Sequence, residues 1–122
     1  MNHSEGKNFL VDVLKILPDD LDCLIQAPSL ENSTIQAKML DSEFDYFKSI
    51  YLDKERKMDF INEDVDHSIG NYIQHIQIRK GAELLFEGFD GVEYGTLSKL
   101  VNIPAWFKEK YIPDTCRRSS EW

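Results

Sequence analysis

The stretch from Asn71 to Lys99 constrains the fold more than any other part of the chain, because short apolar runs alternate there with turn signals. Lys80-Gly81 and Asp90-Gly91 separate the runs, and an Asp-Gly pair between apolar runs is among the strongest sequence signals for a β-hairpin. We therefore predict three antiparallel strands within Tyr72–Ser98, with the rest of the chain packed against one face of this sheet.

Turn lengths set the predicted register. A two-residue turn at Asp90-Gly91 places Leu84 opposite Leu97, and a three-residue turn at Lys80–Ala82 places His75 opposite Glu87. A slip of one residue would turn every side chain to the other face, so the register defines two unlike faces. The predicted core face carries Ile76, Ile78, Leu84, Phe86, Gly88, Gly95 and Leu97. The second face carries His75, Gln77, Arg79, Glu83, Leu85, Glu87, Phe89, Val92 and Tyr94.

Helical periodicity predicts three helices before this sheet and one after it. The first runs from about Ser4 to Pro18, and a short second helix lies between Asp19 and Pro28. The third extends from Asn32 to about Asp53, and the last begins at Ile103-Pro104 and ends at Pro113. Their apolar stripes are Phe9, Leu10, Val13, Leu14 and Leu17; Leu21, Leu24 and Ile25; Ile35, Met39, Leu40, Phe44, Phe47, Ile50 and Tyr51; and Ile103, Phe107 and Tyr111.

The remaining segments carry weaker signals. Met58–Ile61 is a candidate edge strand, Asn62–Gly70 is predicted as a polar loop, and the tail from about residue 114 is predicted to be mobile. Without repeats or Gly/Ser linkers, residues 1–122 are expected to form a single α+β domain. Its predicted architecture is N-terminal helices, a central three- to four-stranded antiparallel sheet and a C-terminal helix. The expected core is Phe9, Val13, Leu14, Leu40, Phe44, Phe47, Ile76, Ile78, Leu84, Phe86, Leu97 and Trp106.

The net charge of the chain limits the kinds of molecule that it is expected to bind. Twenty-two acidic residues against 14 basic ones give a net charge of −8 and a pI near 4.8. Such a field repels nucleic acids and anionic membranes and speeds encounter with a basic protein. The sequence MNHSEGKNFL lacks the pattern of a signal peptide, and no run has the roughly 18 apolar residues of a membrane span, so a cytoplasmic location is expected. Cys23 and Cys116 are expected to be free thiols.

Few residues suit catalysis or metal binding. The acidic stretch Asp59–His67 lacks the ligand order of a calcium loop and the partners of a zinc site. His75 and Glu87 form the only acid–base pair that the register brings together, and no nucleophile or oxyanion donor accompanies them. We therefore expect no enzyme activity, no catalytic residue, no metal and no cofactor.

Acidic residues gather in two stretches that are candidate binding surfaces. Asp19–Asp45 holds seven acids, and Ala82–Ser98 holds four acids and no base, interleaved with Phe89 and Tyr94. Aromatic side chains ringed by carboxylates suit an anchor for a basic protein, although an ordinary polar sheet face fits the pattern equally well. The predicted partner-binding residues are Glu83, Glu87, Phe89, Asp90, Glu93 and Tyr94.

The segment LLFEGFDGVEYGTLSK followed by NIPAWFKEKY, together with the size and acidity of the chain, resembles small bacterial immunity proteins of contact-dependent growth inhibition and other polymorphic toxin systems. The resemblance implies a stable acidic protein that binds a cognate toxin domain, often a basic nuclease, and blocks it. The net charge separately argues against direct contact with nucleic acid or membrane. An alternative from the residues themselves is a small-ligand-binding or regulatory interaction module that uses the exposed sheet face, with His75 and Glu87 in its pocket.

Overall fold

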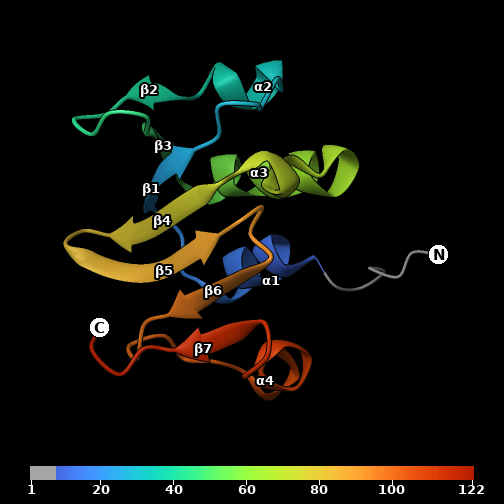
Figure 1. The fold of residues 1–122 in the computed structure, drawn as a ribbon, viewed down its shortest axis with the longest axis vertical. Helices are drawn as coiled ribbons and strands as arrows, with labels where there is room; N and C mark the ends of the chain where they lie inside the picture. Colours follow the sequence, from blue (N-terminus) through green and yellow to red (C-terminus); the bar gives the residue numbers. More distant parts are fainter. Residues whose placement is uncertain (1–7) are drawn as a thin grey trace.

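A computed structural model describes residues 8–122, which form a seven-stranded sheet with helices on one side (Figure 1). The strands lie in the order β2-β3-β1-β4-β5-β6-β7, and neighbours are antiparallel except for the parallel pair β6–β7. The strands are β1 (Leu21–Gln26), β2 (Leu40–Asp41), β3 (Lys48–Leu52), β4 (His75–Lys80), β5 (Glu83–Phe89), β6 (Tyr94–Leu97) and β7 (Cys116–Arg118). The helices are α1 (Phe9–Ile16), α2 (Ser33–Gln36), α3 (Lys54–His67), the 3-10 helix η1 (Ile69–Tyr72) and α4 (Ala105–Tyr111).

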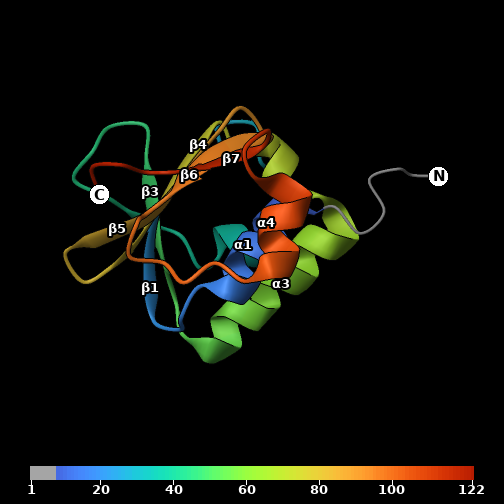
Figure 2. The same ribbon diagram turned by 90° about the horizontal axis from the view of Figure 1, so that it is seen from below.

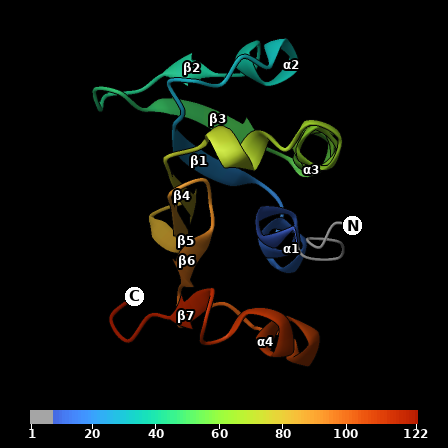
Figure 3. The ribbon, with the colours of Figure 1, turned by 45° about the vertical axis from the view of Figure 1, so that its right-hand side comes forward.

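Helices α1, α3 and α4 all cover the same face of the sheet, as Figures 2 and 3 show. The core lies between them and the strands, and aromatic rings join its layers. The Phe9 ring of α1 packs edge-on against Phe86 of β5 at a centroid distance of 5.7 Å, and lies 4.9 Å from the Tyr111 ring of α4. Within the described residues, no helix lies on the opposite face, which we call the open face.

The structure is α+β, but the predicted architecture is wrong, because the sheet is much larger and helices alternate with strands along the chain. The first error is the predicted second helix, which is strand β1. Its buried side chains alternate, at Leu21, Cys23 and Ile25, and it pairs with both β3 and β4. Periodicity in so short an apolar segment does not distinguish a helix from a buried strand. The segment forms a strand because it pairs with β3 on one side and β4 on the other.

The predicted third helix, from Asn32 to about Asp53, is also wrong, since this segment forms α2, β2 and β3. Asp, Ser, Phe and Tyr residues dominate its middle and have modest helix propensity, so the helical spacing of the apolar residues was coincidental. Consequently Leu40 and Phe44 are not core residues, being 68% and 52% exposed, and Phe47 is only half-buried.

Helix α3 replaces the predicted edge strand and polar loop between Met58 and Gly70. Its N-terminus is capped by the Asp53 side chain, which accepts a hydrogen bond from the Arg56 amide at 2.8 Å. The face that docks on the core holds two apolar residues, Phe60 and Ile61, and two buried charged ones. Because Lys57 and Asp64 occupy half of the buried stripe, hydrophobic periodicity alone did not reveal this helix.

Both buried charged side chains of α3 have hydrogen-bond partners. The Lys57 ammonium group donates to the Leu17 and Pro18 carbonyls at 2.8 and 3.2 Å and contacts Asp19 at 3.1 Å. The Asp64 carboxylate accepts from the Gly70 amide at 2.7 Å. Buried charges need such partners, and these contacts fix α3 against the end of α1 and the start of η1.

The hairpin strands form where predicted, but their registers differ from the prediction. The shift is two residues throughout β5–β6, and two residues in β4–β5 between His75 and Ile78. The β5–β6 connection spans four residues, so Phe89 lies opposite Tyr94 and Phe86 opposite Leu97. In β4–β5 a bulge between Ile78 and Arg79 shifts the register, so His75 lies opposite Phe89 and Ile78 opposite Phe86. A shift of two residues keeps side chains on their predicted face.

The bulge changes which leucine of β5 enters the core. A bulge adds one residue on one strand and reverses the alternation of side chains beyond it. Leu85 is buried, whereas Leu84, a predicted core residue, is only half-buried. Val92, predicted for the second face, is also buried, in the β5–β6 connection.

The first and last helices match their predicted positions. The Asn8 side chain caps α1, Pro18 follows its end, and the predicted cap Ser4 lies outside the described residues. Helix α4 buries Phe107 and Tyr111 as expected, but Trp106 is 44% exposed and does not belong to the core.

The segment from residue 114, predicted to be mobile, forms strand β7 beside β6. Cys116 is fully buried there, and the Ser119 amide donates to the Leu97 carbonyl at 2.7 Å. The Trp122 carbonyl accepts a hydrogen bond from the Lys99 amide, also at 2.7 Å. Each residue of β7 pairs with a residue 21 positions earlier in the sequence, so local periodicity contained no sign of this pairing.

Candidate partner-binding surface

The open face of the sheet carries four aromatic side chains in contact, which we call the aromatic row: Phe47, His75, Phe89 and Tyr94. Ring centroids of successive members lie 5.5, 5.0 and 5.4 Å apart, and the Phe89 and Tyr94 rings are stacked at an interplanar angle of 24°. The row begins at Phe47, which immediately precedes β3, passes β1, and continues across β4 and β5 to β6. Aligned registers produce it, because His75, Phe89 and Tyr94 are cross-strand partners.

A hydrogen-bonded chain holds the centre of this row. The His75 ring nitrogen Nε2 lies 2.6 Å from Glu87 Oε2, and the same oxygen accepts from the Gln77 amide group at 3.3 Å. Gln77 in turn accepts from the Arg79 guanidinium at 3.3 Å. Each side chain is half-buried, so the chain orients the imidazole between the rings of Phe47 and Phe89.

The His75–Glu87 contact was expected, though for a different geometric reason. The predicted register placed the two residues directly opposite each other, whereas the structure pairs Glu87 with Gln77 and joins Glu87 to His75 diagonally. Diagonal neighbours on one sheet face remain within reach of long side chains. Because the Glu87 carboxylate is already engaged, it positions His75 and is not a free rim charge.

The six predicted partner-binding residues do not form one cluster. Phe89 and Tyr94 stack on each other, and the Tyr94 hydroxyl donates to Asp90 Oδ2 at 3.2 Å, which raises the pKa of Tyr94. Glu83 lies at the opposite end of β5, where it pairs with Lys80 at the hairpin tip. Glu93 lines a cavity beside α1 and α4. Glu87, Phe89, Asp90 and Tyr94 therefore remain together, and Glu83 and Glu93 lie apart from them.

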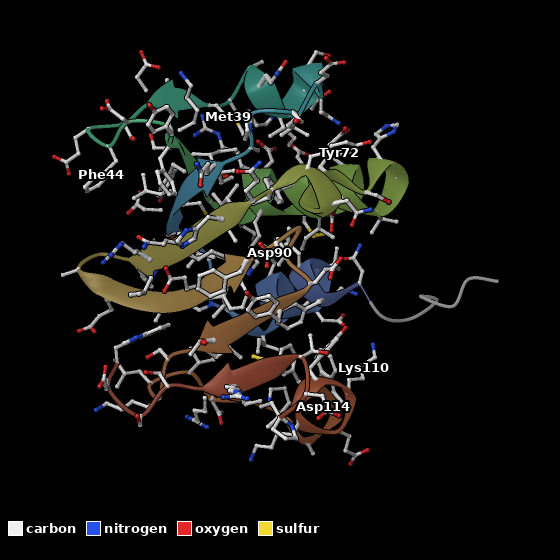
Figure 4. All side chains as sticks on the ribbon, in the orientation of Figure 1. Met39, Phe44, Tyr72, Asp90, Lys110 and Asp114 are labelled. Atoms are coloured by element: carbon white, nitrogen blue, oxygen red, sulfur yellow. The ribbon has the colours of Figure 1, made fainter. Side chains whose placement is uncertain are left out.

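Sequence reasoning missed Phe47 as a surface residue, along with Phe44 and Tyr46 beside it, because all three fell in the predicted third helix. Figure 4 shows Phe44 at the outer end of the β2–β3 connection, pointing away from the strands. The sequence did contain a signal for a turn here, in the acidic residues at Asp41, Glu43 and Asp45 and in Ser42. Asp and Ser are more typical of turns than of helix interiors.

A cavity of about 810 Å³ lies on the helix side between α1, α4 and the β5–β6 connection. Its two buried carboxylates, Asp12 and Asp64, already have partners within the chain. Asp12 accepts from the Tyr111 hydroxyl at 2.6 Å and from the Lys110 ammonium group at 2.8 Å, and Asp64 accepts from Gly70. Burial and the hydrogen bond to Asp12 raise the pKa of Tyr111. These contacts join α4 to α1 and are explained by packing alone.

Within residues 8–122, no three His, Cys, Asp or Glu side chains gather closely enough to hold a metal ion. None of the helices in this part of the chain is long and apolar enough to cross a membrane. Comparison with protein-family models, with curated proteins and with solved structures found no match.

Proposed function

We propose that this chain binds a cognate, basic bacterial toxin domain of the nuclease type and neutralises it by stoichiometric inhibition, without catalysing a reaction. The observation that carries the proposal is the aromatic row, laid across a sheet face that no described helix covers, on a chain with a net charge of −8. The resemblance of its C-terminal third to immunity proteins supports the same function and a cytoplasmic site of action.

Physical reasons favour a protein partner for this surface. Stacked aromatic side chains give a large, rigid contact area at little cost in conformational entropy, as binding hot spots require. The acidic field of the whole chain should raise the association rate with a basic partner. The Asp90 carboxylate borders the row through its bond with Tyr94 and is exposed, so it should contribute mainly to steering.

The test is to mix the purified chain with the product of the adjacent reading frame and measure association and dissociation rates at several salt concentrations. We expect an association rate that falls steeply with salt. Phe89→Ala and Tyr94→Ala should each weaken binding by about 2 kcal/mol or more, mainly through faster dissociation. Asp90→Asn should cost less and act on the association rate.

Trp106→Ala is the matched control, because Trp106 is 44% exposed, close to the 48% of Tyr94, but belongs to α4 on the other side of the sheet. It should leave binding unchanged. Absence of a complex at micromolar concentration would contradict the proposal. So would a complex that tolerates the Phe89 and Tyr94 changes as well as it tolerates the Trp106 change.

A second candidate function is a small-ligand or regulatory module on the same face. The observation that favours it is the His75–Glu87 hydrogen bond held between the rings of Phe47 and Phe89. A ligand that binds the native state raises the melting temperature. Thermal-shift screening with metabolites separates the two functions, since stabilisation that His75→Ala abolishes would favour the ligand module over the toxin inhibitor.

A further inference from the structure

The connection between β2 and β3, residues 42–47, carries a second exposed aromatic group beside the aromatic row. Tyr46 is 85% exposed and Phe44 is 52% exposed, so two aromatic side chains only two positions apart meet solvent here. Phe47, the last residue of this connection, is also the first member of the aromatic row, through its contact with His75. Figures 1 and 2 show the connection projecting from the sheet on the side away from the helices. Phe47 therefore links this connection to the aromatic row.

Local hydrogen bonds define the shape of this connection. The Ser42 hydroxyl lies 2.9 and 2.7 Å from the carbonyls of Phe44 and Phe47, and it accepts a hydrogen bond from the Phe44 amide at 3.1 Å. The Phe47 amide donates to the Phe44 carbonyl at 3.2 Å. Tyr46 has a φ of +71°, a left-handed conformation that bulky residues rarely adopt. The backbone thus holds the Tyr46 ring where it is exposed to solvent.

A hollow of about 400 Å³ lies within this connection and against Ala27 and Pro28. Aromatic and acidic side chains line it together, among them Phe44, Asp45 and Tyr46. Asp41 is also in its wall but is paired with Lys48, which lowers the pKa of Asp41. Among the described residues, Asp45 takes part in no ion pair. Lys48 also lines the hollow, but its ammonium group is paired with Asp41, so the Asp45 carboxylate borders the hollow next to two exposed rings without a cation bound to it.

We infer that this hollow receives an arginine side chain of the basic partner. The inference rests on the proposed function and adds the chemistry of a second contact. Acidic residues alone would not define such a site, but a hollow lined by two aromatic residues and a carboxylate is complementary to a planar cation. A guanidinium group stacks on aromatic rings and bonds a carboxylate through two parallel donors. A lysine ammonium group is more strongly hydrated and offers only a point charge, so arginine is the better ligand.

The experiment uses the full chain labelled with 15N and the peptide acetyl-Gly-Arg-Gly-Arg-Gly-amide, with its lysine and citrulline counterparts. Amide chemical shifts are followed during titration at low salt. The arginine peptide should shift the amides of residues 41–48 most, with affinity in the order arginine, lysine, citrulline. Asp45→Asn and Tyr46→Asn should each weaken binding about twofold or more, and by roughly tenfold together. Asn suits position 46, since it tolerates a positive φ.

Glu83→Gln is the control, because it removes one negative charge at the distant hairpin tip and leaves the hollow intact. Its titration should match that of the unchanged chain. Shifts spread evenly over all acidic surfaces, or equal affinity for the arginine and lysine peptides, would overturn the inference. No toxin is present in this experiment, so its result does not depend on whether the chain binds a toxin. Binding of the arginine peptide without a complex with the adjacent gene product would reject only the proposed function.

Discussion

Replacement of Gly95 in β6 by alanine tests how the core positions the open face. A Cβ atom at Gly95 would lie 2.6 Å from the Glu87 carbonyl oxygen and 2.7 Å from two atoms of the Phe86 ring. Neither neighbour can move freely. The carbonyl belongs to the adjacent strand, and the Phe86 ring is fully buried against Phe9. Since Tyr94 precedes Gly95, any displacement of β6 also displaces the end of the aromatic row.

Overpacking of this kind costs roughly 1–3 kcal/mol. The gain from replacing glycine within a strand, about 0.5–1 kcal/mol, offsets part of that cost. We therefore expect Gly95→Ala to lower the free energy of unfolding by about 1–2 kcal/mol, and the melting temperature by several degrees. The measurement is urea denaturation followed by circular dichroism, with an unchanged dependence on denaturant as evidence that the unfolding transition is the same.

Gly88→Ala is the matched comparison, because Gly88 is the cross-strand partner of Gly95 and its added Cβ would meet only side chains, the nearest at 2.9 Å. Side chains adjust more cheaply than a paired backbone, so this variant should be less destabilised. Adding Phe86→Leu to Gly95→Ala should cost less than the sum of the two separate changes, as expected for residues in contact. A Gly95→Ala protein as stable as the unchanged chain would refute the reasoning, as would a more damaging Gly88→Ala.

Two further predictions concern buried polar groups on the helix side. Burial raises the pKa of Asp64, although the Gly70 hydrogen bond partly opposes this, so the carboxyl contributes stability at acid pH that is lost as the pH rises through its folded-state pKa. We compare the free energy of unfolding of the Asp64→Asn variant with that of the unchanged chain. The difference should favour the variant more at pH 7 than at pH 3. Urea titrations at both values check this, and the opposite order would contradict it. Tyr111→Phe removes a 2.6 Å hydrogen bond to the buried Asp12 carboxylate and should cost about 1.5–3 kcal/mol in thermal unfolding. Tyr94→Phe, which removes an exposed bond to Asp90, should change stability by less than about 0.5 kcal/mol, and equal effects of the two changes would be inconsistent with this account.

Local patterns predicted the parts of the fold that local interactions control. The apolar stripe of α1 and its end before Pro18, the docking face of α4 and the three hairpin strands were all visible in the sequence. The faces of β4 and β6 were also correct, because a shift of two residues preserves the alternation of side chains. The meeting of His75 and Glu87 was predicted correctly, since it needed only the right face and nearby strands.

Only the tertiary structure decided the features that depend on distant partners. Strand β1 exists because β3 and β4 pair on its two sides, and β7 exists because β6 lies open to it. Helix α3 buries Lys57 and Asp64, which is possible only where Leu17, Pro18 and Gly70 supply hydrogen-bond partners. Phe47 joins the aromatic row for the same reason, since its place beside His75 depends on the order of strands across the sheet. Periodicity reports the environment of a residue within its own segment, and a contact between segments depends on the free energy of the whole packed chain.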